Sequence, residues 1–408
     1  MKITYLHQYF NTPEMSGGTR SYEMARRLVA MGHEVNMVTT WRGRDGRKGW
    51  FQTVEAGTRV HWLPLPYSNH MSYHDRIQAF LTFAWHSARK AALLDTDIIF
   101  ATSTPLTIAL PAVYASRKCK VPMVFEVRDL WPELPIAMGA LRNPLTRSAA
   151  KWLERFAYRS SAEIVALSPG MADGIAHTGY PDSRITVIPN SADIESFFPD
   201  RQRGRQFRDL HKIDDDQLLV IYAGTFGRLN DVSYLVRLAE RVIANRGIHF
   251  LTVGGGDEFK KVHDLANSSG VLGRNFTMLE RLPKSAMPDV FAAADVCTSL
   301  FLPLPEMEAN SANKFFDGLS AGCCMAINYG GWQSELLASS GAGLQLDRDV
   351  QIAARQLEAL ANNHEYLKKA KREARKLARE RFSRDKLAAQ LEQVLLRSVG
   401  CASNSGND

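Results

Sequence analysis

Lys314 and Asp317 stand three residues apart in the segment "NKFFDGLSAG", whose flanking residues are mostly apolar. On a helix this spacing puts both side chains on one face. A carboxylate can accept two hydrogen bonds from a vicinal diol, and an ammonium group can bind a phosphate. The alternative is a solvated Lys–Asp pair, which the apolar neighbours disfavour. The spacing therefore places an acid and a base side by side on one helix, where they could contact a polar ligand.

Two glycine-bearing loops could bring backbone amides close to phosphate oxygens. Gly17 and Gly18 lie between an expected strand and a helix that starts near Thr19, and Gly224 and Gly227 follow the strand "LLVIYA". Glycine has no Cβ to block a close approach, and the positive end of a helix attracts anions. Taken alone, either pair is better explained as a tight turn. Neither loop matches G-x-G-x-x-G or a Walker A motif, which disfavours a nicotinamide oxidoreductase and a P-loop enzyme.

These loops must be positioned by the elements around them, and the sequence alternates between β-rich and helical segments. Expected strands such as "KITYLH", "EVNMVTT" and "DIIFATS" alternate with helical patterns such as residues 76–94. Strand–helix–strand repetition predicts parallel sheets with helices on both faces. The fold class predicted is α/β.

The pattern restarts after a polar, highly charged stretch at residues 201–217, which is typical of a linker. We expect an N-terminal Rossmann-like domain at 1–195 and a C-terminal one at 196–384. Ligands of such sheets bind beyond the carboxyl ends of the strands, so two domains facing a cleft are expected. A C-terminal helix at 385–398 is expected to cross back to the first domain, followed by a disordered tail at 399–408.

Composition is normal for a soluble globular chain, with 45% apolar and 23% charged residues among 408. The five cysteines form no C-x-x-C pair, and the eleven histidines show no ligand spacing, so no metal site is predicted. No apolar run is long enough to span a membrane, and no signal peptide is recognised, which predicts a cytoplasmic protein.

The net charge of +7 is uneven, since residues 1–195 carry 22 Lys and Arg against 17 Asp and Glu. This excess suits an anionic membrane or a phosphorylated acceptor, and an ordinary basic surface explains it equally well.

Six segments in order carry a resemblance to a known family. They are "SGGTRSYEMARRLVAMGHEV", "VIPNSAD", "VIYAGTFGRLNDVSYL", "LTVGGGDEFKKV", "LERLPKSAMPDVFAAADV" and "NKFFDGLSAGCCMAINYGG". Together they resemble the GT-B glycosyltransferases of family 4, most closely the bacterial branch that builds O-antigen, capsule and other surface polysaccharides. The resemblance extends from residue 1 to about 395. It implies metal-independent, retaining transfer of a sugar from a UDP-sugar, with no cofactor.

The resemblance also implies residue roles. Asp317 would hold the ribose hydroxyls and Lys314 the diphosphate, while Arg281 and Leu282 would meet the uracil with backbone groups. Gly17 and Gly18 would lie near the transferring sugar and the diphosphate, and Gly224 and Gly227 would act similarly from the second domain. The loop at 253–257 is interpreted as structural.

The sequence departs from the family at several positions. Where many relatives have an Arg and a Lys that grip the diphosphate, this chain has Thr225 and Asn230, with Arg228 nearby in another register. The acid expected eight residues before the ribose acid is Ala309, and Glu306 or Glu308 could replace it, with Glu308 our candidate.

A further departure concerns the strand "VFEVRD", where many relatives end in a histidine near the donor sugar. This chain has Arg128 followed by Asp129. Arg128 could contact a phosphate or a sugar hydroxyl, and Asp129 could orient it. No nucleophile is assigned to Asp129 or Glu126. The segment "RDLWPE" is one that we associate with polysaccharide assembly.

The function predicted is sugar transfer from a UDP-sugar to a glycan acceptor, linked to polyprenyl diphosphate, at the cytoplasmic face of the inner membrane. Two alternatives stay open: a non-catalytic GT-B subunit that scaffolds an assembly complex, and a UDP-sugar epimerase. No nucleic-acid partner is expected.

A mixed aromatic and basic segment at residues 67–93 could rest on that membrane. Its aromatic residues are Tyr67, Tyr73, Phe80, Phe83 and Trp85, and its basic residues are Arg76, Arg89 and Lys90. The alternative, which we favour slightly, is a helix that buries its aromatic residues in the core.

Overall fold

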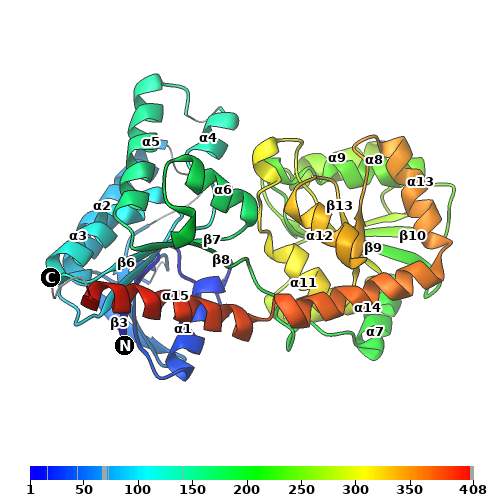
Figure 1. Cartoon of the computed structure of the whole chain (residues 1–408). Helices are drawn as coiled ribbons and strands as arrows, with labels where there is room; N and C mark the ends of the chain where they lie inside the picture. The colour runs from blue at the N-terminus through cyan, green and yellow to red at the C-terminus, as the bar shows by residue number, and fades with distance from the viewer. Residues whose placement is uncertain (16, 44, 67–70, 72, 140, 405–408) are drawn as a thin grey trace. The chain divides into compact units, whose positions relative to one another are not determined.

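The structure is a computed structural model that describes residues 1–15, 17–43, 45–66, 71, 73–139 and 141–404. The chain divides into two compact units. Unit 1 comprises Met1–Pro189 and Arg384–Asp408, and unit 2 comprises Asn190–Ser383. Each contains a sheet with helices packed on it (Figure 1). The boundary expected after residue 195 lies a few residues beyond this division.

The sheet of unit 1 has eight strands in the order β3-β4-β2-β1-β5-β6-β7-β8. They are β1 (Lys2–Leu6), β2 (Glu34–Trp41), β3 (Phe51–Glu55), β4 (Thr58–Pro64), β5 (Ile98–Thr102), β6 (Met123–Val127), β7 (Glu163–Ala166) and β8 (Ile185–Val187). All neighbours pair in parallel except β3 and β4, which form an antiparallel edge that the sequence did not predict. Gly57 makes this possible because its φ of +82° allows the tight turn from β3 into β4.

The helices of unit 1 connect these strands and cover both faces of the sheet. They are α1 (Arg20–Ala30), α2 (Tyr73–Ala91), α3 (Ala109–Cys119), α4 (Glu133–Ala137), α5 (Pro144–Arg159), α6 (Pro169–His177) and α15 (Arg384–Asn404), with short 3₁₀ turns at Leu106–Ile108 and Asp182–Arg184. Helix α2 packs beside α3, and α3 packs beside α5. The predicted strand–helix alternation is confirmed for this half of the chain.

Helix α15 returns to unit 1 and packs with α1. Leu387, Leu391 and Val394 are fully buried in the same core cluster as Leu28. The packing expected for residues 385–397 is therefore confirmed. The tail expected from residue 399 was wrong in its first part, because α15 continues to Asn404 and Val399 packs against the core cluster; residues 405–408 lie outside the described part.

Unit 2 has a six-stranded, wholly parallel sheet in the order β11-β10-β9-β12-β13-β14. The strands are β9 (Leu218–Thr225), β10 (Ile248–Gly255), β11 (Phe276–Leu279), β12 (Val296–Ser299), β13 (Cys324–Ile327) and β14 (Gly343–Gln345). The helices are α7 (Arg201–His211), α8 (Ser233–Arg241), α9 (Phe259–Ser268), α10 (Met287–Ala293), α11 (Asn313–Ala321), α12 (Trp332–Ser340), α13 (Val350–Ala361) and α14 (His364–Arg381). Turns of 3₁₀ helix lie at Arg228–Asn230, Lys284–Ala286 and Pro305–Met307.

The linker predicted at residues 201–217 was wrong, because its first part forms α7. Asp200 caps this helix by accepting hydrogen bonds from the amides of Gln202 and Arg203. Phe207 is buried, and the buried Arg208 donates to the carbonyl of Ala293 and pairs with Asp295 at 2.7 Å. High charge density indicated solvent exposure, but these charges have specific partners inside unit 2.

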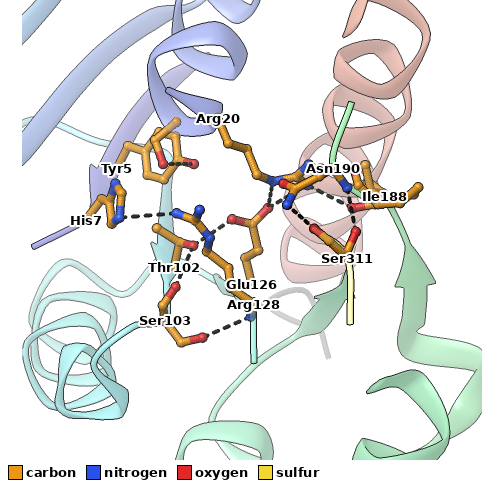
Figure 2. Close-up of polar contacts among 12 residues, drawn as sticks. Tyr5, His7, Arg20, Thr102, Ser103, Glu126, Arg128, Ile188, Asn190 and Ser311 are labelled. Carbon is orange, nitrogen blue, oxygen red and sulfur yellow. Dashed lines mark hydrogen bonds and ion pairs between the residues drawn. The ribbon is translucent and has the colours of Figure 1, made fainter. Parts of the chain in front are cut away.

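Unit 1 contains a fully buried ion pair between Arg20, at the start of α1, and Glu126, in β6 (Figure 2). The guanidinium donates to Glu126 Oε1 from Nε at 3.0 Å and from Nη2 at 2.9 Å. It also donates to the carbonyls of Ile188 and Pro189, the last residues of unit 1 before the chain enters unit 2. Thr102 donates to Glu126 Oε2 at 2.6 Å.

Burial alone would raise the pKa of Glu126, but Arg20 and Arg128 together with Thr102 lower it below its ordinary value. The carboxylate is therefore charged at neutral pH, and every oxygen has a partner. This arrangement ties α1, β5, β6 and the end of β8 together.

We predict that Arg20→Met lowers the free energy of unfolding of unit 1 by about 3–5 kcal/mol, because it leaves Glu126 buried without a counter-charge. Urea denaturation followed by tryptophan fluorescence measures this change, since six of the seven tryptophans lie in unit 1. Asp95→Asn is the control: it removes the exposed Lys2–Asp95 pair and should cost less than about 1 kcal/mol. Equal effects of the two changes would contradict the prediction.

Candidate functional site

The order of strands in unit 2 reverses direction at β9 and β12. After β9 the chain adds β10 and then β11 on one side of β9. It then returns to add β12 and β13 on the other side of β9. In parallel sheets the loops at such a reversal diverge and leave room for a ligand at the carboxyl ends of the strands. Gly224 lies near the end of β9, and the segments that follow β9 and β12 carry Asn230 and Lys314.

Lys314 lies in the first turn of α11, and its ammonium group reaches the end of β9. Nζ donates to Tyr222 Oη at 3.0 Å and lies 4.5 Å from the centroid of the same ring. The ring of Phe301 lies 5.3 Å away on the β12 side. In the described part of the chain, no carboxylate lies within ion-pair distance of Lys314.

Asn230 completes the surroundings of this cation. Oriented so that both ends of its amide are satisfied, its oxygen accepts from Lys314 Nζ at 3.1 Å and its nitrogen donates to the carbonyl of Thr225 at 2.9 Å. Tyr222 also donates to that carbonyl, at 2.6 Å. Gly224 leaves room for the lysine, since a Cβ there would lie 3.3 Å from Lys314 Cε.

Burial lowers the pKa of Lys314 to about 7. Although part of the side chain stays exposed, its neighbours are neutral hydroxyl, amide and aromatic groups, which compensate poorly for lost hydration. At neutral pH this amine is therefore only partly protonated, because it lacks a counter-charge. An anion would supply one.

The other predicted donor residues lie at the carboxyl ends of strands of the same sheet. Arg228 is exposed after β9, and Asp317 is half-buried one turn after Lys314 on α11. Arg281 and Leu282 follow β11, two strands away from β9. Among the described residues, none of these four hydrogen-bonds with Lys314.

The segment between β12 and α11 contains the two acids that could replace Ala309. Glu308 is exposed and packs against Gly330 and Gly331. The φ of +82° at Gly331 lets the chain pass close to the carbonyl of Glu308. Glu306 is half-buried, and its Oε2 has no hydrogen-bond partner in the described part of the chain. The geometry thus gives Glu306 as good a claim as Glu308.

The loop at 253–257 has the structural role that its glycines suggested. A Cβ on Gly254 would lie 1.8 Å from the carbonyl oxygen of Gly224, and one on Gly256 would lie 2.6 Å from that of Phe226. Phe226 also donates its amide to the carbonyl of Gly255. These glycines let β10 press against the end of β9 and so support the loop beside Lys314.

Unit 1 has its own reversal of strand order, between β1 and β5. There Arg128, directly after β6, donates from Nη1 to His7 Nε2 at 3.3 Å, and its amide donates to Ser103 Oγ at 3.0 Å (Figure 2). Asp129 is exposed and accepts a hydrogen bond from Thr104 at 3.4 Å. The predicted Arg128 and Asp129 therefore lie at the edge of the sheet where ligands bind.

His7 is buried, and burial together with Arg128 and Arg42 holds its pKa well below the ordinary value. The ring is neutral, so Nε2 accepts from Arg128 and Nδ1 carries the proton. Nδ1 has no hydrogen-bond partner among the described residues. The sequence reasoning missed His7 and Tyr222; the position of His7 directly after the first strand was the available signal.

The glycine loop before α1 is held from behind by Asn11. Its amide donates to the carbonyl of Gly18 at 3.2 Å and accepts from Arg42. Gly17 has a φ of +130°, and a Cβ there would lie 2.6 Å from Asn11 Nδ2. Gly17 and Gly18 are both exposed, so their backbone is accessible to a ligand.

The aromatic segment expected at a membrane or in the core is only partly buried. Phe83 is buried, whereas Trp85 is 59% exposed and stacks with Arg89 at 4.2 Å. Tyr67 and the side chain of Tyr73 lie outside the described residues. No described helix has the length and apolar character to cross a membrane, and no three described His, Cys, Asp or Glu residues cluster as metal ligands.

Comparison with known proteins agrees with this architecture. Residues 17–191 match the family described as "Glycosyl transferase 4-like domain". Alpha-maltose-1-phosphate synthase of Mycolicibacterium smegmatis is 26% identical over 195 residues, which cover 45% of this chain and 49% of that protein. The chain thus matches about half the length of this curated relative.

Solved structures match nearly the whole chain. Sucrose-phosphate synthase from Thermosynechococcus elongatus has a TM-score of 0.78 and 14% identity, covering 98% of this chain and 99% of that one. HepE of Anabaena in complex with UDP-glucose has a TM-score of 0.71 and 15% identity, covering 97% and 100%. The predicted fold class, GT-B with two Rossmann-like parallel-sheet domains, is confirmed.

The low pKa of Lys314 makes a prediction about stability and pH. Between about 7 and the ordinary value near 10.4, the unfolded chain binds a proton that the folded site has lost, so stability rises with pH. Wild type should therefore gain stability relative to Lys314→Met as pH increases through this window. Urea midpoints of both proteins at a series of pH values test it, and a constant difference would show that burial does not destabilise the ammonium form.

Proposed function

We propose that this protein is a retaining glycosyltransferase that moves a sugar from a UDP-sugar to a glycan acceptor. The observation that carries the proposal is Lys314, a cation without a counter-charge at the strand reversal of unit 2. A nucleoside diphosphate supplies the missing negative charge. The same fold holds UDP-glucose in the HepE structure, which supports a UDP-sugar as the donor.

The chemistry of transfer explains why such a cation is useful. As the anomeric bond breaks, the leaving UDP gains negative charge, and groups fixed in advance lower the barrier by stabilising it. Lys314 becomes fully charged when the diphosphate binds, because the anion raises its pKa. Tyr222 and Asn230 fix its position through hydrogen bonds. We assign the ribose hydroxyls to Asp317, one turn further along α11.

The remaining donor contacts are assigned by position at the same edge of the sheet. Thr225 ends β9 and Arg228 follows it, and both would approach the phosphates, with Gly224 keeping the backbone accessible. Arg281 and Leu282 follow β11 and would meet the base through backbone groups. Glu308, with Glu306 as the alternative, would bind hydroxyls of the transferred sugar. No metal is required in this proposal, because Lys314 and backbone amides offset the charge of UDP.

We assign the acceptor to unit 1. Arg128 is held by neutral His7 and by Ser103, so it can present its guanidinium to a phosphate or a sugar hydroxyl. Asp129 beside it is exposed and would orient a hydroxyl. Gly17 and Gly18 would bring backbone amides to the sugar or the diphosphate. We place the acceptor among glycans linked to polyprenyl diphosphate, in O-antigen or capsule assembly at the cytoplasmic face of the inner membrane, on the likeness of "RDLWPE" to that branch.

Removing either donor contact should weaken UDP binding. We expect Lys314→Ala and Asp317→Ala each to raise the Kd for UDP by about 10- to 100-fold, as for the loss of a hydrogen bond to a charged group. Isothermal titration calorimetry measures both. The matched controls are Lys260→Ala and Asp264→Ala, an exposed Lys–Asp pair on α9 of the same unit, which should leave the Kd unchanged.

Two outcomes would overturn parts of this proposal. Unchanged UDP affinity in both variants means that the donor site lies elsewhere. No binding of UDP and no slow hydrolysis of any UDP-sugar by wild type would favour the scaffold function over the enzyme.

Arg128 allows a separate test of unit 1. We expect Arg128→Gln to lower the turnover of UDP-sugar by about 100-fold, as for the loss of a donor to developing charge, with the Kd for UDP unchanged. Arg59→Gln, at an exposed ion pair of unit 1, is the control and should keep full turnover. A matching loss of UDP affinity would instead place Arg128 among the donor contacts.

A further inference from the structure

Helices α3 and α5 of unit 1 present an outward surface that combines exposed apolar residues with cations. We call it the α3–α5 face; it comprises Tyr114, Arg117 and Lys118 of α3 and Leu145, Lys151, Trp152, Arg155 and Arg159 of α5. Leu145 is 80% exposed, Trp152 62% and Tyr114 50%. Large apolar side chains at such exposure on adjacent helices mark an interaction surface.

The sequence of α5 builds this surface while it packs the opposite side of the helix. Ala157 and Tyr158 are buried against unit 1. Leu145, Ser148, Trp152, Arg155 and Arg159 follow one another at spacings of three and four residues, which places them along one outward stripe. The exposed stripe is therefore an ordered feature of the helix.

The charge of the face is of one sign. Helix α3 has no acidic residue, and the only one on α5 is Glu154, which is buried. Within the described part of the chain, none of the five cations of the face has a carboxylate at ion-pair distance. The cation-rich α14 differs, since its Lys371 pairs with Asp295 and its Arg375 donates to three backbone carbonyls.

A groove of about 560 Å³ runs along the face between the helices. It is lined by Arg117, Lys151, Trp152, Arg155, Phe156 and Arg159, among others. Trp152 stacks on Phe156 with ring centroids 5.3 Å apart, and the Arg117 guanidinium lies 5.8 Å from the Phe156 ring. The cations thus surround the stacked rings of Trp152 and Phe156 in the groove.

We propose that the α3–α5 face docks the protein on a bilayer rich in anionic phospholipids. Lys and Arg around exposed Trp and Leu are typical of surfaces that lie in the interface of a membrane, where phosphate groups meet the cations and the apolar side chains enter the acyl boundary. A soluble polyanion would match the cations but would leave Leu145 and Trp152 in water. The proposal deepens the membrane part of the proposed function and moves it away from α2, whose Arg89 stacks on its own Trp85.

Vesicle flotation without any donor tests the proposal on the full chain. Wild type should float with vesicles of phosphatidylcholine mixed with phosphatidylglycerol, and should not float with phosphatidylcholine alone. Arg155→Glu with Arg159→Glu should weaken binding by more than about tenfold, since each cation near an anionic surface contributes about a fivefold factor. Trp152→Ser with Leu145→Ser should weaken it similarly, at low and at high salt, because the apolar contribution is not screened.

Matched controls come from exposed positions of unit 2. Arg241→Glu with Arg246→Glu makes the same change in net charge, and Leu210→Ser removes a leucine that is equally exposed. Both should float as wild type does. Thermal melting and UDP affinity of every variant show that folding and the donor site are intact, so failure here is distinguishable from failure of the proposed function.

The proposal is overturned if the α3–α5 variants float as well as wild type. It is also overturned if only Trp85→Ser abolishes flotation, since that result would assign docking to α2. It is overturned, too, if Arg241→Glu with Arg246→Glu weakens binding as much as Arg155→Glu with Arg159→Glu, since binding would then depend only on the net charge of the protein.

Discussion

The buried pair of Arg20 and Glu126 is the interaction on which the candidate residues of unit 1 depend. Arg20 directly follows Thr19, after the loop that contains Gly17 and Gly18. Glu126 precedes Arg128 by two residues. Because a buried charge is costly without its partner, the pair fixes the start of α1 against the end of β6. The same guanidinium binds the carbonyls of residues 188 and 189, so it also fixes the point at which the chain leaves unit 1.

Unit 2 contains cations in two different settings. Its structural cations are paired, as Arg208 and Lys371 are with Asp295, whereas Lys314 has only neutral partners. A folded chain keeps such an arrangement at a cost in stability. The cost is understandable if a ligand supplies the missing charge, since strain and unpaired groups concentrate at functional sites. The contrast between Lys371, which pairs with Asp295, and Lys314, which has only neutral partners, is stronger evidence for an anion site than the presence of a lysine alone.

Local periodicity in the sequence was enough to predict the main elements of both units. Strand and helix alternation indicated the two parallel sheets, and the spacing of Lys314 and Asp317 placed both on α11. Periodicity could not predict pairs that form only on folding, such as Arg20 with Glu126 or His7 with Arg128, which are more than a hundred residues apart. For the same reason α7 was mistaken for a linker, because its charges find their partners on the distant Ala293 and Asp295.

The departure from the family at Thr225 and Asn230 has a physical explanation in this geometry. Where relatives place two cations, this chain places the carbonyl of Thr225 and the amide of Asn230, which bind each other and the hydroxyl and ammonium groups of Tyr222 and Lys314. Lys314 is thereby held by two neutral hydrogen-bond partners, Tyr222 and Asn230. In the proposed site, a single fixed cation would leave the second phosphate to backbone amides, for which Thr225 and Arg228 are the exposed candidates. The substitutions are therefore compatible with the proposed binding of a diphosphate.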